Sequence, residues 1–152
     1  MLWDLLLVTL AKGVSAAAQP VLRWRARTEG PRQRARIADM PTTPIAEAHA
    51  GIRVRIAGTV EALRARAPEP SRTGAFLVRD GSGAAALVQP ASAAGIYASD
   101  GSPAARPGAG TCVDVCGVAR AVDAALDREL ADGAVRLVFA GSERDPLFVL
   151  HR

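Results

Sequence analysis

Two segments of this chain follow the same eight-residue pattern. The first copy, residues 51–58 (GIRVRIAG), and the second copy, residues 110–117 (GTCVDVCG), each begin and end with Gly. Each copy also carries β-branched aliphatic residues at its fourth and sixth positions, and side chains two apart point to the same face of a strand. Both copies are therefore predicted to be strands with one buried face. The residues predicted to be buried there are Val54, Ile56, Val113 and Val115.

The closing Gly of each copy favours a barrel, because a strand can bulge or bend sharply at Gly. The 152 residues suffice for one domain with extensions, and two Trp, one Tyr and three Phe are too few to dominate its core. A core built mainly from Val, Leu, Ile and Ala suits a small barrel. The predicted fold class is all-β: a small OB-like β-barrel, closed or partly open, with an N-terminal α-helix. Such an architecture does not by itself define a function.

The barrel is predicted over residues 41–152, behind an N-terminal helix (1–24) and a basic linker (25–40). A hairpin turn is expected at residues 80–83 (DGSG), and a long mobile loop over 91–109, which is rich in Ala, Gly, Ser and Pro. The last two strands are expected to close the sheet; left open, they would favour dimerisation or capture of a partner strand. The predicted strands are 53–63, 75–79, 84–89, 111–122, 135–140 and 147–150, with a helical turn at 123–130.

Residues 2–22 are amphipathic at helical spacing, with a polar stripe opposite an apolar side. A membrane-spanning helix needs about 20 mostly apolar residues, and Lys12 near its middle would cost about 2.5–3.5 kcal/mol. An interfacial helix therefore explains the pattern better than a spanning one. The residues expected to contact the membrane are Trp3, Leu6, Leu7, Leu10, Arg23, Trp24, Arg25 and Arg27.

Positive charge is concentrated after this helix. The net charge is +4, and residues 23–36 carry six Arg against one acid, Glu29. Such a cluster attracts anionic lipid headgroups or nucleic acid, and after a spanning helix it would keep the barrel on the cytoplasmic side. A secretory signal ending at residues 16–18 (AAA) is a weaker alternative, because Asp4 lies early and no positive charge does. A helix that packs on the barrel or on a second copy of itself is the other alternative.

The sequence contains no recognisable catalytic or cofactor-binding constellation. Cys112 and Cys116 are spaced too far apart along one strand for a disulfide, and structural zinc sites use tighter spacings and four ligands. The two cysteines are therefore expected to be reduced. There is no nucleophile elbow and no phosphate-binding Gly-rich loop, so we expect a non-enzymatic protein with no metal and no cofactor.

An OB-like barrel makes nucleic acid a second candidate ligand. Such sites combine a basic groove with exposed aromatic side chains that stack on bases. Phe76, Phe139 and Phe148 lie in apolar runs and are expected in the core, which leaves Tyr97, in the predicted loop, as the stacking candidate. The residues expected to bind a protein partner or a nucleic acid are Arg53, Arg55, Arg64, Arg66, Arg72 and Tyr97.

From residue 36 onward the order of features resembles the GIDE-type, or beside-a-membrane, domain. This domain occurs in ubiquitin ligases of the MULAN type and in many prokaryotic membrane proteins. The matching segments are 37–47 (IADMPTTPIAE), 51–60, 76–83 (FLVRDGSG), 110–117 and 145–149 (DPLFV). The resemblance implies an OB-like barrel next to a membrane, preceded by an apolar anchor, which agrees with the pattern of residues 2–24.

Two departures from that family limit what the resemblance implies. The ligases carry a C-terminal RING rich in Cys and His that these residues lack, so ligase activity is not expected. The insert that the family tends to carry after the first strand is reduced here to about residues 65–73. We therefore expect a membrane-proximal interaction or scaffold module that binds a protein partner. The alternative is a single-stranded nucleic-acid-binding protein, and a homo-oligomer is compatible with either.

Overall fold

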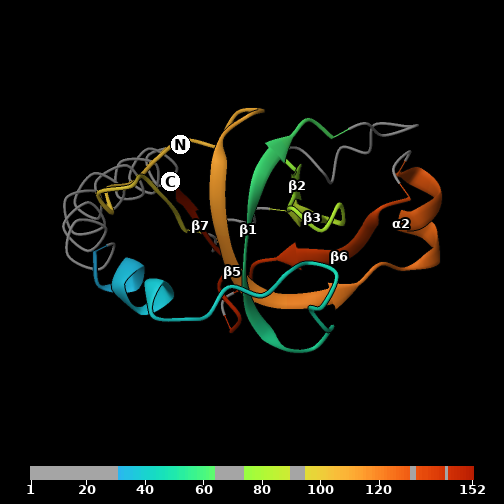
Figure 1. Ribbon diagram of the computed structural model, residues 1–152, viewed down its shortest axis with the longest axis horizontal. Coiled ribbons are helices and arrows are strands. Elements are labelled where there is room, and N and C mark those ends of the chain that lie inside the picture. The colour runs from blue at the N-terminus through green and yellow to red at the C-terminus, as the bar shows by residue number, and fades with distance from the viewer. Residues whose placement is uncertain (1–30, 64–73, 90–94, 131–132, 143) are drawn as a thin grey trace, which may run out of the picture.

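The two copies of the pattern lie side by side as paired strands in the computed structural model (Figure 1). The structure describes residues 31–63, 74–89, 95–130, 133–142 and 144–152. Strands β1 (Arg53–Glu61) and β5 (Cys112–Ala121) are antiparallel and pair along seven consecutive residues of β1, from Arg53 to Thr59. The repeat in the sequence thus forms the central strand pair of the fold.

The opening glycines of the two copies are used in the same way. Gly51 and Gly110 each have a φ of +87°, a left-handed conformation that residues with a side chain rarely adopt. Each also donates its N–H across the strand pair at 2.8 Å, Gly51 to the carbonyl of Ala119 and Gly110 to that of Val60. Each glycine turns the chain into its strand and is tied to the opposite strand.

Five strands close into a barrel in the order β1, β2, β3, β6, β5 and back to β1. β2 (Phe76–Arg79) and β3 (Ala85–Gln89) form the predicted antiparallel hairpin. β6 (Val135–Ala140) runs parallel to β3 and antiparallel to the end of β5. The prediction of a small, closed, mostly β-barrel is therefore confirmed.

The last strand of the sequence does not close this barrel, a point that the sequence left open. β7 (Phe148–His151) instead lies outside it and pairs antiparallel with β5. β4 (Gly95–Tyr97), within the predicted loop 91–109, pairs in parallel with β7 and completes a seven-stranded sheet. β5 can hold both neighbours on one edge because β7 pairs with its first half and β6 with its last residues.

Alternate side chains of the strands fill the barrel interior. Ile56, Val113 and Val115 are fully buried there, as the alternation in the two copies predicts, and Val54 packs against them partly buried. Phe76 and Phe139 are also fully buried in this interior, so their assignment to the core is confirmed.

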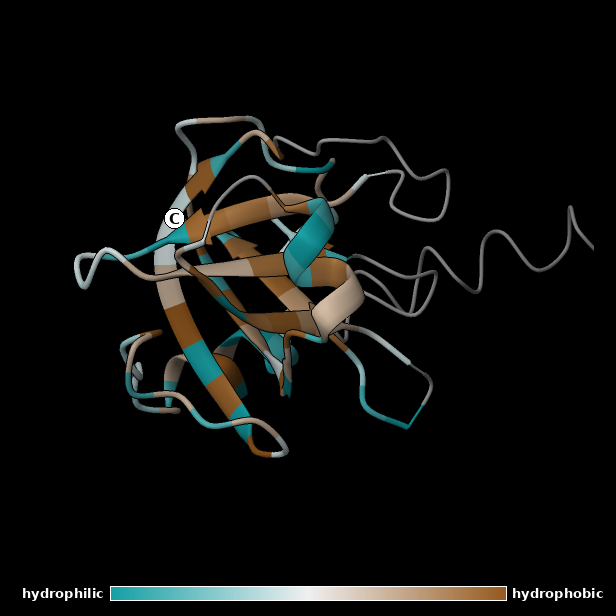
Figure 2. Ribbon diagram, turned by 90° about the vertical axis from the view of Figure 1, so that its right-hand side faces the viewer, coloured by the Kyte–Doolittle hydropathy of each residue, from teal (hydrophilic) through white to brown (hydrophobic). Residues whose placement is uncertain are grey.

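Helix α2 (Ala124–Glu129) covers one outer face of the barrel, in front of the strands in Figure 2. It begins at Asp123, whose carboxylate accepts from the N–H of Leu126 at 2.7 Å. Leu126 packs with the outward side chains of Leu77 and Leu87 in a second apolar cluster. The outer face of β2 and β3 is therefore apolar and is covered by this helix.

A helix over residues 31–38, α1, packs on the opposite side of the molecule (Figure 1). The sequence predicted a linker over 25–40 because this stretch is polar and Arg-rich. One apolar residue is enough to dock the helix: Ile37 is buried against Cys116 of β5 and Leu150 of β7. Most of the remaining α1 side chains are exposed, which explains why the composition resembles that of a linker.

The predicted anchor helix (1–24) lies outside the described residues. Within the part of the chain that the structure describes, no helix is both long enough and apolar enough to cross a membrane. All eight residues expected to contact the membrane lie within residues 1–30, which are outside the described residues.

Candidate binding groove

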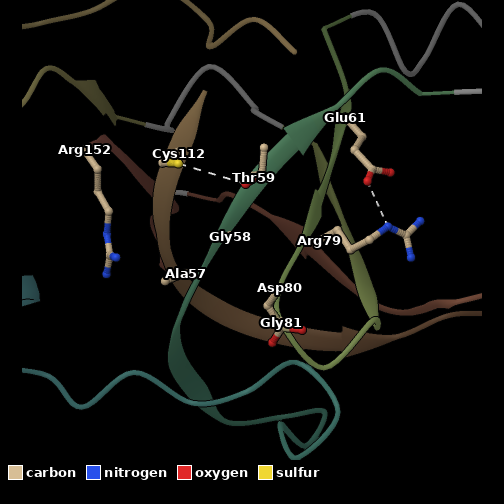
Figure 3. A pocket seen from close by; sticks show the side chains of 9 residues that line it. All are labelled: Ala57, Gly58, Thr59, Glu61, Arg79, Asp80, Gly81, Cys112 and Arg152. Atoms are coloured by element: carbon tan, nitrogen blue, oxygen red, sulfur yellow. Dashed lines mark hydrogen bonds and ion pairs between the residues drawn. The ribbon is translucent and has the colours of Figure 1, made fainter. Parts of the chain in front are cut away.

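A shallow groove of about 490 Å³ lies over the outer face of β1 (Figure 3). A second hollow of about 410 Å³ shares Ala57, Asp80 and Gly81 with it and extends it toward residues 42–47. The two helices pack elsewhere, α2 on β2 and β3 and α1 on β5 and β7. The residues that line the first hollow are Ala57, Gly58, Thr59, Glu61, Arg79, Asp80, Gly81, Cys112 and Arg152.

The groove forms because β1 pairs with β5 over a longer stretch than with β2. β2 pairs with β1 only from Thr59 to Glu61. Closer to the start of β1, Thr43 instead bonds to this edge of the strand: its N–H donates to the carbonyl of Arg55 at 2.8 Å. Ala57 lies between these two attachments and lines both hollows. The outer surface of the barrel is therefore recessed at the middle of β1.

Gly58, the closing glycine of the first copy, permits the close approach of β1 and β2 beside the groove. A Cβ atom at this position would overlap the carbonyl oxygen of Arg79 and lie 2.8 Å from Cγ1 of Val78. Backbone atoms cannot move away as the end of a flexible side chain can. Gly at this position is therefore a requirement of the packing.

The groove carries charges of both signs. On one side, Nε of Arg79 donates to Oε1 of Glu61 at 2.9 Å, and Nη1 of Arg79 donates to the carbonyl of Gly83 at 2.8 Å. On the other side, Arg152 pairs with Asp114 at 2.8 Å while half of its side chain (51%) is exposed. Thr59 and Cys112 lie between these pairs, with Oγ1 and Sγ 4.0 Å apart. The floor is thus a small polar strip between two ion pairs.

Asp80 fixes one end of the groove. Its Oδ2 accepts from the N–H of Ile45 at 2.6 Å, and its Oδ1 accepts from both the N–H and the hydroxyl of Ser82. Burial acts to raise the pKa of Asp80, but the hydrogen bonds from Ser82 and Ile45 outweigh it and lower the pKa. Residues 80–83 form the turn that the sequence predicted, and Asp80 ties that turn to the turn at residues 45–47.

Arg55 does not lie free on the surface, although the alternation of β1 points it outward as predicted. Its Nη1 donates to the carbonyls of Ile37, Ala38 and Met40 at 2.9–3.1 Å. Its Nη2 pairs with Oδ2 of Asp114 at 2.8 Å. Every one of these contacts is internal to the fold and only 13% of the side chain is exposed, so Arg55 presents little surface to a partner, and its role in binding stays a prediction.

The other predicted binding residues are dispersed. Arg53 is partly exposed, donates to the carbonyl of Pro146 at 3.3 Å and lies 3.9 Å from Asp145. Tyr97 lies in β4, not in an irregular loop, and stacks on Phe148 with ring centroids 6.4 Å apart. Arg64, Arg66 and Arg72 are outside the described residues. None of the predicted binding residues that the structure describes lines the groove.

Both cysteines are free, and they occupy different environments. Cys112 is exposed in the groove floor, whereas Cys116 is buried beneath α1 with its Sγ 3.5 Å from Sδ of Met40. Burial raises the pKa of the Cys116 thiol. One signal for the polar cluster near the groove was present in the sequence: Asp114 is a charged residue in the middle of an aliphatic strand.

Comparison of the chain with known protein families, with curated proteins and with solved structures gave no match.

Proposed function

We propose that this chain is a non-enzymatic interaction module that binds a protein partner in the groove over β1, next to a membrane. The observation that carries the proposal is the coverage of the barrel. α1 and α2 occupy the outer faces of β5, β7, β2 and β3, and the groove over β1 is the recess left between them. Its mixed charges and polar floor are typical of the polar part of a protein interface.

We also assign the barrel to the OB type. Five strands in a mixed, closed barrel, with a hairpin from β2 to β3 and a curved long strand shared between neighbours, are compatible with that architecture. OB folds bind oligonucleotides on the face of their second and third strands. Here the corresponding face carries Leu77 and Leu87, which are buried beneath α2.

The groove itself favours a protein over a nucleic acid. Single-stranded nucleic acid is held by a basic track with aromatic side chains for base stacking. Among the described residues that line the groove none is aromatic, and Arg79 and Arg152 each have a carboxylate partner. The charges of the lining residues Glu61, Arg79, Asp80 and Arg152 cancel, so the groove offers little net attraction to phosphates.

The membrane part of the proposal rests on the amphipathic pattern of residues 2–22 and on the resemblance to the beside-a-membrane domain. The GIDE-type assignment is likewise a proposal, supported by the order of the sequence segments and by the small barrel that they form. An anchor upstream of residue 31 would hold the barrel close to the bilayer.

Site-specific photo-crosslinking in the native cells tests the proposal. A photoreactive amino acid replaces Thr59 at the floor of the groove or, as the control, the exposed Asp127 of α2. We expect a discrete crosslinked product from position 59 and none from position 127. Protease should remove this product, and nuclease should leave it intact. A nuclease-sensitive product at position 59 would overturn the proposal in favour of nucleic acid, and equal products at both positions would overturn the assignment of the groove.

A further inference from the structure

An apolar face of the barrel is covered by the chain's own N-terminal side. On β5 and β7 the outward side chains of Cys116, Leu150 and Phe148 form one cluster, to which Ile37 and Met40 contribute from above. Cys116 is only 2% exposed beneath this cover. We call residues 31–41, which provide the cover, the strap.

The strap is attached through few contacts. Ile37 is its one deeply buried apolar side chain among the described residues, and Met40 is only partly buried. α1 makes up most of the strap, and among its described residues (31–38) most side chains are exposed. The strap is therefore held on the barrel by few apolar contacts.

Arg55 supplies the polar half of that docking. Carbonyls at the end of a helix lack partners within the helix, and a cation there also offsets the helix dipole. Nη1 of Arg55 donates to the carbonyls of Ile37 and Ala38 in the last turn of α1 and to that of Met40 just beyond it; the carbonyl of Ile37 also accepts from the N–H of Met40. Asp114 holds Arg55 in place, so one ion pair of the barrel determines where the strap lies.

We propose that the strap opens as a unit while the barrel stays folded, and that opening uncovers the apolar face around Cys116. The hinge lies at Thr42 and Thr43, which remain attached to β1 through the bridge between Thr42 and Arg55 and the N–H of Thr43. The barrel interior contains no strap residue, so it loses no packing when the strap leaves. The inference does not depend on what the groove binds.

The two cysteines of the chain make the opening measurable in the unmodified protein. Cys112 is exposed and reports the intrinsic reactivity of a thiol, whereas Cys116 reacts only when its cover is removed. With a thiol reagent in excess, we expect Cys116 to react at least about tenfold faster than global unfolding allows, with little dependence on low denaturant. Reaction of Cys116 at the rate set by global unfolding would overturn the proposal.

A matched pair of substitutions separates strap opening from loss of stability. Ile37→Ala removes the apolar contact of the strap and Leu126→Ala removes the equivalent contact of α2. We expect Ile37→Ala to raise the rate at Cys116 at least about tenfold. Leu126→Ala should lower the unfolding midpoint, but Cys116 should stay protected at denaturant concentrations below that midpoint. An unchanged rate in Ile37→Ala, or a rise at Cys116 in Leu126→Ala that matches its loss of global stability, would contradict an independent strap.

Discussion

Arg55 and Asp114 occupy the same position, the fifth, in the two copies of the repeated pattern, and they form an ion pair at 2.8 Å across the paired strands. Both side chains are nearly buried, 13% and 7% exposed, on the outer surface of the barrel. The inward positions of the two copies carry the same kind of residue, whereas these outward positions carry opposite charges. The repeat therefore builds a core on one side and a charge pair on the other.

Removing Asp114 is expected to destabilise the protein by about 3–5 kcal/mol, because Arg55 would remain buried without its counter-ion. The substitution is Asp114→Ala, and the measurement is the free energy of unfolding in denaturant. Arg152→Ala is the control, since Arg152 bonds the same carboxylate but is half exposed; its cost should be about 1 kcal/mol or less. Equal costs for the two variants would show that the pair with Arg55 is not the important one.

Gly58→Ala is expected to cost about 1–3 kcal/mol or more, because the added methyl group meets backbone atoms of Arg79. Gly108→Ala is the matched control: a Cβ there meets nothing within 4 Å, so its effect should lie within about 0.5 kcal/mol of zero. Thermal or denaturant unfolding of both variants provides the test. A Gly58→Ala variant as stable as the control would mean that β1 and β2 do not approach this closely.

The hydrogen bonds to Asp80 should make stability depend on pH. The pKa of Asp80 is lowered in the folded protein, so ionisation of this carboxyl favours folding. This contribution is fully present above the ordinary carboxyl pKa of about 4 and is lost as the pH falls through the folded-state value. Asp80→Asn should therefore lower stability at pH 7 more than at acidic pH. Exposed Asp39, replaced by Asn, is the comparison; a parallel pH dependence in both variants would refute the role of Asp80.

Binding to anionic liposomes is expected to depend on the apolar side of residues 2–22. In the full chain, Leu6→Gln combined with Leu10→Gln should reduce the membrane-bound fraction at least about tenfold, because two leucine side chains no longer enter the bilayer. Ser15→Gln, on the polar stripe, should leave binding unchanged. Co-sedimentation with salt and carbonate washes measures the effect. Equal binding of both variants would show that the helix is not the anchor.

Much of the barrel could be predicted from the sequence because its determinants are local. The alternation in the two copies identifies the inward residues of β1 and β5, and the DGSG turn identifies the hairpin of β2 and β3. β4 escaped prediction because three residues in a loop-like composition carry no usable periodicity. Its pairing is determined by β7, more than 50 residues later in the chain.

The binding residues could not be predicted in the same way. Arg53 and Arg55 point outward, as the alternation requires, but the sequence does not show what lies above them. Arg55 is covered by carbonyls 15–18 residues earlier in the chain, and the groove brings together Thr59, Cys112 and Arg152 from three strands or their ends. Such a site depends on contacts between segments far apart in the chain. A single sequence does not show those contacts.

The reactivity of Cys112 measures most directly whether the groove binds a protein. Cys112 is exposed in the groove floor of the isolated chain, so purified protein should react rapidly with a thiol reagent. In native membranes we expect Cys112 to react severalfold more slowly, with nuclease treatment leaving this protection in place. The same rate for Cys112 in membranes and in purified protein would contradict a protein partner in the groove.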